Sequence, residues 1–145
     1  MTKTFTLSEA QTLLPVLESL LRRAQVASAR AAELEREMQE LSQRIFLSGG
    51  MHVNVAVAAR RRAECEKATQ GAKAALEEID SIGVRVQDFE AGVLDFPCVV
   101  EGRTVLLCWK LGEAAIAHWH GEEDGAEASK PVEMLFGKSE RERLN

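Results

Sequence analysis

Residues 83–110 read GVRVQDFEAGVLDFPCVVEGRTVLLCWK, and this stretch decides the fold. Apolar and polar residues alternate along it with the period of two that is typical of β-strands. Glu101-Gly102 is a two-residue hairpin turn between β-rich flanks, with glycine where a positive φ is needed. Leu111-Gly112-Glu113 marks a second turn. The pattern predicts a small antiparallel meander of about four strands, at Val84–Phe89, Val93–Val100, Thr104–Lys110 and Ala115–His120.

The sequence before this stretch has helical periodicity. Thr6 and Glu9 form a capping-box pattern, so the first helix is expected to begin near Leu7. Pro15 lies inside the helical pattern and predicts a kink, or a short first helix rejoined to a long one. Apolar residues recur at alternating steps of three and four, which predicts one long amphipathic helix of coiled-coil type. These residues are Ala10, Leu13, Leu17, Leu20, Ala24, Ala27, Ala31, Leu34, Met38, Leu41 and Ile45.

A second helix is expected after the Gly49-Gly50 break, capped by Asn54 and running from Val57 to about Ser81. Its apolar seam is weaker, because Arg62 and Thr69 interrupt it. The short connection predicts that the two helices form an antiparallel hairpin. The fold class is therefore α+β, a long two-helix hairpin followed by the meander.

The length of 145 residues is that of one ordinary domain, so we expect residues 1–145 to form a single one. Within it the hairpin occupies residues 6–82, the meander 83–120, and an acidic loop and tail 121–145.

The composition is that of a globular protein, with 46% hydrophobic and 28% charged residues and a net charge of −5. Neither a membrane span nor a signal peptide is recognisable. Three cysteines without a Cys-x-x-Cys pair are typical of a reducing compartment, so a cytoplasmic location is expected. The only basic run is Arg60–Arg62, which fits a solvated helix face and gives no basis for nucleic-acid binding.

Pairing across the Glu101-Gly102 turn sets the faces of the sheet. It places Asp95 opposite Cys108, and opposed residues share a face. One face is then apolar and is expected to pack on the helices, with Leu94, Phe96, Cys98, Val105, Leu107 and Trp109. The other face carries Asp95, Pro97, Leu106 and Cys108.

This register disfavours a zinc site built from Cys98, Cys108, His118 and His120. The spacing is not that of a structural zinc motif, and the two cysteines lie on opposite faces of the hairpin.

His118 and His120 share a face, since they are two apart on a strand, and with a carboxylate they can hold a metal. The third ligand is Glu122 if the strand continues; Asp95 or Glu113 qualifies only if the second turn changes the register by one residue. The alternative is that both histidines line the sheet edge or a subunit contact. His118, His120 and Glu113 are therefore weak candidates for metal ligands.

Cys108 is a candidate nucleophile, because it shares a face with Asp95. An adjacent carboxylate raises a thiol pKa, however, so a half-buried strand residue is the favoured interpretation. Trp109 and Trp119 are interpreted as core or interface anchors.

The chain resembles the domain of unknown function 2203 family. The resemblance rests on FTLSEAQTLLP at Phe5–Pro15, the Gly49-Gly50 pair, and the run Gly83–Pro97. It implies a small cytosolic bacterial protein without an assigned activity. Residues 125–130 depart from the arginine-bearing loop that is frequent in the family. The positions that match the family pattern are Asp88, Gly92, Asp95, Phe96, Pro97, Cys108, Trp109, Gly112, Glu113, Trp119 and His120.

Two functions remain open at this point. The first is a non-enzymatic interaction or structural protein, in which the hairpin buries its apolar seam against a second copy as a homodimer or larger homo-oligomer. The second is a metal-dependent enzyme or metal-binding protein that uses the Asp95, Glu113 and His120 cluster. In that case the catalytic candidates, which converge at one end of the sheet, are Asp95, Cys108, Glu113 and His120. No cofactor is expected under the first function, and a transition metal is expected under the second.

Overall fold

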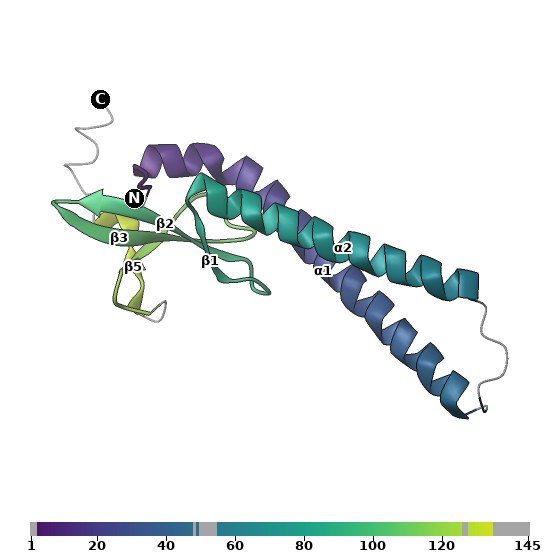
Figure 1. The fold of residues 1–145 in the computed structure, drawn as a ribbon. Coiled ribbons are helices and arrows are strands. Elements are labelled where there is room, and N and C mark those ends of the chain that lie inside the picture. The colour runs from purple at the N-terminus through teal and green to yellow at the C-terminus, as the bar shows by residue number, and fades with distance from the viewer. Residues whose placement is uncertain (1–2, 48, 50–54, 126–127, 135–145) are drawn as a thin grey trace. The chain divides into compact units, whose positions relative to one another are not determined.

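The computed structural model describes residues 3–47, 49, 55–125 and 128–134 (Figure 1). It confirms an α+β fold in which two helices precede an antiparallel sheet. The chain forms two compact units, one of residues 1–19 and 78–145 and one of residues 20–77. The first unit contains the sheet and the second is the helical hairpin. Among the described residues, no helix is long and apolar enough to cross a membrane.

Helix α1 spans Leu7–Leu47 and begins as the capping box predicts. The Thr6 amide donates to Glu9 Oε1 at 2.9 Å, and the Glu9 amide donates to Thr6 Oγ1 at 3.1 Å. These two bonds satisfy amides that a helix start leaves without an intrahelical partner. Pro15 lies within α1 and does not end it, so, of the two expected alternatives, the separate short first helix does not form.

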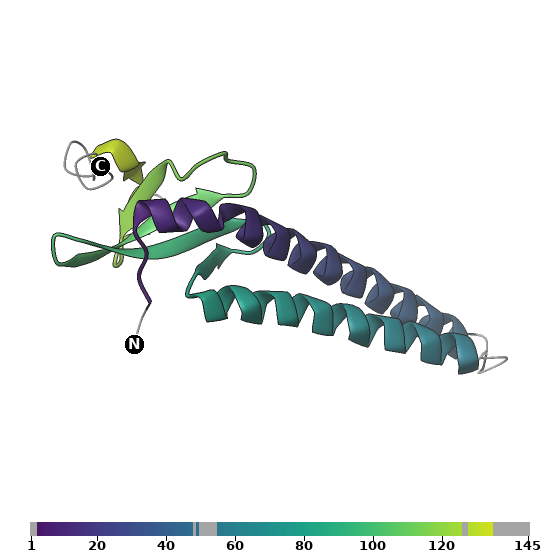
Figure 2. The same cartoon turned by 90° about the horizontal axis from the view of Figure 1, so that it is seen from above.

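Helix α2 spans Val55–Ile82 and pairs with α1 in the hairpin unit (Figure 2). Arg30 bridges Glu64 at 3.3 Å, and the Cys65 thiol lies 3.6 Å from the Ala31 carbonyl oxygen. The two helices therefore close on each other within one chain. The predicted cap Asn54 lies outside the described residues.

Five strands form one sheet in the order β1-β2-β3-β4-β5. The register predicted for the central hairpin is confirmed from Val100↔Arg103 to Leu94↔Trp109. Glu101 and Gly102 both have positive φ, as a tight two-residue hairpin requires. The strands are β1 (Arg85–Asp88), β2 (Val93–Val100), β3 (Arg103–Lys110), β4 (His118–Gly121) and β5 (Lys130–Pro131).

Strand β5 was not predicted, because two residues are too few for a period of two to appear. Its proline sits at the sheet edge, where no ladder amide is needed.

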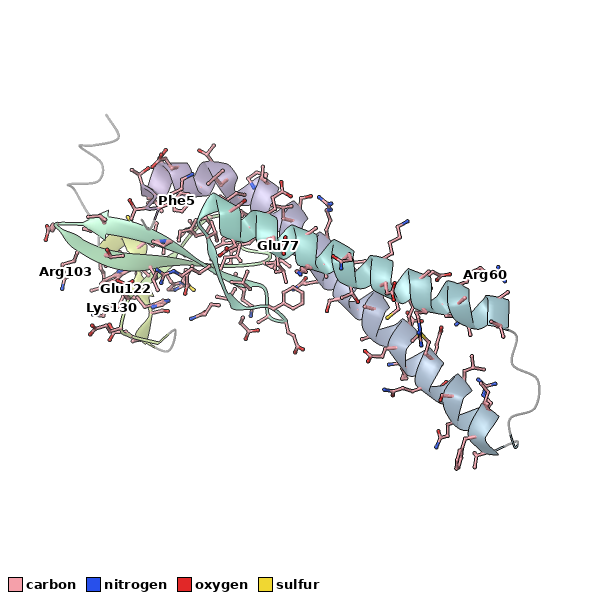
Figure 3. The ribbon with its side chains drawn as sticks, viewed as in Figure 1. Phe5, Arg60, Glu77, Arg103, Glu122 and Lys130 are labelled. Atoms are coloured by element: carbon pink, nitrogen blue, oxygen red, sulfur yellow. The ribbon has the colours of Figure 1, made fainter. Side chains whose placement is uncertain are left out.

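The apolar face of the β2–β3 hairpin is the core of the sheet unit. Figure 1 and Figure 2 both show the first turns of α1 over β2 and β3. Phe5, labelled in Figure 3, meets Phe96 edge to face with ring centroids 5.8 Å apart. Its amide donates to the Pro97 carbonyl at 2.7 Å. The opposite face is covered as well, since Asp95 and Leu106 are buried.

Candidate functional site

Three neighbouring strands each contribute one polar side chain to the second face of the sheet. Asp95 comes from β2, Cys108 from β3 and His120 from β4. Asp95 and Cys108 are directly opposed, whereas His120 is opposite Leu106 and reaches the other two diagonally. One side-chain ligand atom from each residue lies within 4.8 Å of the others. We call these three residues the Asp-Cys-His cluster.

The orientation of the His120 ring is fixed by two backbone carbonyls. Nδ1 lies 3.0 Å from the Gly121 oxygen and 3.1 Å from the Asp124 oxygen. Carbonyl oxygens only accept hydrogen bonds, so Nδ1 must carry the hydrogen. Nε2 lies 3.3 Å from Asp95 Oδ1; a protonated ring donates to this carboxylate, and a neutral ring with its hydrogen on Nδ1 offers the Nε2 lone pair to a cation.

Both members of this pair are removed from water, with 3% of the His120 side chain and 6% of the Asp95 side chain exposed. Burial raises the pKa of the Asp95 carboxyl above its ordinary value, against the opposing effect of the nearby His120. The cluster is therefore a polar group in a dry environment, which must be fully satisfied to be tolerated.

Cys108 is half-buried and completes the cluster on its more accessible side. Burial, followed by the charge of Asp95 and the hydrogen bond to it, raises the pKa of the Cys108 thiol to about 12. The predicted direction of this effect is confirmed. A thiol that holds its proton so firmly is a poor nucleophile at neutral pH unless a cation replaces the proton.

The turn after β4 holds the histidine. The Asp124 amide donates to the Gly121 carbonyl at 3.0 Å, so this carbonyl serves both the turn and the His120 ring. A side chain at Gly121 would place its Cβ 2.5 Å from Asp124 Oδ2. Backbone carbonyls leave no residue-type signal, and the sequence therefore did not reveal them as part of the site.

A family model with the description "Uncharacterized conserved protein (DUF2203)" matches residues 3–132. The chain belongs to this family. No curated protein and no solved structure matches the chain. The match of the DUF2203 model spans all three residues of the Asp-Cys-His cluster as well as the turn that holds His120.

Glu113 does not join the cluster in this DUF2203 chain. Its Oε1 accepts from the Lys110 amide at 2.8 Å, and its carbonyl oxygen accepts from Trp109 Nε1 at 2.9 Å. Glu113 thus closes the turn after β3 and anchors the buried Trp109, although its charge still contributes to the high pKa of Cys108.

His118 is exposed. Cys98 is buried on the face of the sheet opposite to Cys108, as the register predicted. Asp95 lies on the same face as His118 and His120 without the one-residue change of register at the second turn that we expected to be necessary. Cys108 pairs with both Asp95 and His118, which puts Asp95 and both histidines on one face.

A cleft of about 380 Å³ lies beside the turn that follows β4. Arg103, Glu122 and Lys130 line it and are labelled in Figure 3. Lys130 Nζ lies 5.4 Å from the ring centroid of Trp119, whose Nε1 finds no hydrogen-bond partner among the described residues. The cleft mixes both signs of charge, so it does not indicate one class of ligand.

Proposed function

We propose that this protein binds one divalent transition metal ion of the zinc class through Asp95, Cys108 and His120. The observation that carries the proposal is the anchoring of His120 Nδ1 by two backbone carbonyls, which leaves Nε2 facing Asp95. Two carbonyls accept the Nδ1 hydrogen, so Nε2, which lies beside the Asp95 carboxylate, is the ring nitrogen that can bind an ion. Metal-binding histidines typically have this arrangement, with the second ring nitrogen held by a carbonyl or carboxylate.

The spacing of the donor atoms supports this function. Zinc–nitrogen and zinc–oxygen bonds of about 2.0–2.2 Å at tetrahedral angles separate two ligand atoms by about 3.3–3.5 Å. The observed separation of His120 Nε2 and Asp95 Oδ1 is 3.3 Å. The two ligand atoms can therefore contact one ion with little movement of the backbone.

The chemistry of the donor set supports the zinc class. Thiolate, imidazole and carboxylate together suit zinc and its neighbours in the first transition row, and they do not suit magnesium or calcium. A divalent cation also offsets the two negative charges that burial opposes at Asp95 and Cys108.

Three protein ligands leave one tetrahedral position for water or for an outside ligand, which is the arrangement of catalytic zinc sites. Cys108 is the least buried of the three, so access is expected from its side. Metal binding is the proposed function, and catalysis would be a further step at this fourth position.

Metal content of the untagged full chain tests the proposal. After chelation and dialysis, we expect added Zn²⁺ to be retained at about one equivalent per chain and to raise the Tm. His120→Ala should abolish retention. His118→Ala is the matched control, because His118 lies on the same strand but is exposed. Retention below about a tenth of an equivalent, or equal loss in both variants, would overturn the proposal.

Cobalt provides a second and more specific measurement. A Co²⁺–thiolate bond gives a charge-transfer band in the near ultraviolet, so the band should vanish in Cys108→Ser. Cys65→Ser should leave it unchanged, because Cys65 lies in the hairpin unit and donates to Ala31. If the band survives Cys108→Ser, the thiolate ligand is wrongly assigned.

A further inference from the structure

Helix α1 in the hairpin unit carries its charges in two consecutive blocks of opposite sign. Residues 20–32 contain three arginines and no acidic residue, a net charge of +3. Residues 33–43 contain four glutamates and one arginine, a net charge of −3. Steps of three and four connect one largely exposed stripe along a single side of the helix, in which Arg30 and Glu37 also pair with Glu64 and Arg61 of α2. The stripe consists of Arg22, Val26, Arg30, Glu33, Glu37 and Glu40.

The same side of the hairpin has two hollows between its helices, and the larger of them is apolar. A groove of about 610 Å³ has Val26, Ala27, Leu34, Ala68 and Gly71 in its lining. A second groove, of about 340 Å³, lies further along the hairpin and includes Met38, Leu41 and Glu40. Val26 lines the larger groove, and 71% of its surface is exposed.

The hairpin also lacks a core of its own over most of its length. Among the described residues from 35 to 71, no apolar side chain is fully buried. Isolated helices gain most of their stability from packing an apolar stripe against a neighbour. A long hairpin with half-exposed Met38 and Leu41 therefore needs a covering partner.

We infer that this side of α1 packs antiparallel against α1 of a second copy of the chain. A two-fold axis near residues 31 and 32 would bring each basic block against the acidic block of the other copy. Arg23, which stands next to the stripe at the edge of the larger groove, would then face Glu40 of the partner. An interface of this kind is self-complementary, as two-fold dimers require.

The size of the hairpin is sufficient for a stable dimer. The 28 residues from Leu20 to Leu47 extend about 42 Å, and two adjacent helices are about 20 Å wide, giving a face on the order of 800 Å². This is the area that each partner contributes to a standard stable interface, about 800 Å².

Charge reversal tests the antiparallel arrangement. Arg23→Glu alone and Glu40→Arg alone should each weaken the dimer by at least about tenfold, because two like-charge contacts form in each variant. An equimolar mixture of the two variants should associate as tightly as the wild type, since both contacts then pair opposite charges. Residues 23 and 40 are about 25 Å apart along one helix, so rescue cannot arise within one chain.

Sedimentation velocity measures all three samples, and Glu35→Arg, an exposed position on the side of α1 opposite the stripe, is the control that should leave the dimer intact. Circular dichroism checks that each variant keeps its helices. A wild-type monomer at about 100 µM would overturn the inference, as would a mixture no tighter than its components. The hairpin unit contains none of the metal ligands, so the result is independent of metal binding.

Discussion

His120 Nε2 lies 3.3 Å from Asp95 Oδ1, although 25 positions separate the two residues in the chain. The contact follows from two strand registers, because β3 places Cys108 between the strands that carry them. His118 is the direct neighbour of Cys108 across the sheet, yet the diagonal residue His120 makes the contact. The carbonyls of Gly121 and Asp124 account for this choice, since they hold the ring inward.

The buried pair should contribute to stability even without metal. In chelator, His120→Ala should lower the free energy of unfolding by about 1–3 kcal/mol, because it leaves the buried Asp95 without its partner. His118→Ala is exposed and should change it by less than about 0.5 kcal/mol. Urea unfolding monitored by tryptophan fluorescence measures both.

The cost of His120→Ala should also depend on pH. Loss of the histidine removes an effect that lowers the pKa of Asp95, so burial raises this pKa further. A carboxyl with a raised folded-state pKa favours folding at low pH, and this contribution is lost as pH rises through that pKa. The variant should therefore be less destabilised near about pH 5 than near about pH 8. If His120→Ala lowers the free energy of unfolding equally at both pH values, Asp95 is not protonated in the variant.

Cys108 should resist alkylation in the folded, metal-free protein. Burial and Asp95 raise the thiol pKa from 9.0 to about 12, so far less of the thiol is ionised at pH 8 than in an ordinary cysteine. Asp95→Asn removes a charge that raises this pKa and should accelerate modification. Iodoacetamide labelling followed by peptide mass spectrometry reports Cys108 separately from Cys65. Labelling of Cys108 at the same rate in folded and unfolded chains would show that the thiol is not protected.

The sequence predicted the β2–β3 hairpin well, because the alternation of apolar and polar residues and a single tight turn determine it. The hairpin register from Leu94 to Trp109 is correct, because Glu101-Gly102 leaves a single pairing. It also identified Asp95, Cys108 and His120 as residues of interest. It placed Glu113 in the second turn but also counted it as a ligand candidate, because a carboxylate that accepts a backbone amide has the same local pattern as one that faces a cleft.

The helical seam was predicted less completely. Leu14 and Leu21 are buried although they lie outside the regular three-four pattern, whereas Met38 and Leu41 belong to the pattern and are only half-buried. Periodicity specifies which side of a helix is apolar, but burial depends on the neighbour that covers it. Along the hairpin this neighbour is one helix, and in the sheet unit it is a whole sheet.

The capping box at the start of α1 should be measurable in isolation. Thr6→Ala removes the acceptor for the Glu9 amide and should cost about 1 kcal/mol of unfolding free energy. Thr12→Ala is a matched control in the same helix, because the Thr12 hydroxyl donates only to the Ser8 carbonyl within the helix. This change should be within about 0.5 kcal/mol. Equal costs for the two variants would show that the capping box makes no specific contribution.

The last prediction concerns the turn that holds His120. Gly121→Ala places a methyl group 2.5 Å from the Asp124 carboxylate, so the turn must shift or the Asp124 side chain must rotate. If the turn shifts, the two carbonyls leave His120 Nδ1, and we expect at least about tenfold weaker Zn²⁺ binding. Asp124→Ala by itself should bind normally, because Asp124 contacts the ring through its backbone oxygen.

The double variant Gly121→Ala with Asp124→Ala distinguishes two causes of weaker Zn²⁺ binding. One is a steric clash with the Asp124 side chain, and the other is a change in the backbone at position 121. The double variant removes the carboxylate that the new methyl group would meet, so Zn²⁺ affinity measured by calorimetry should return to within about threefold of the wild type. Failure of this rescue would mean that the glycine is needed for the backbone itself. Normal binding by Gly121→Ala alone would show that the turn does not control the orientation of His120.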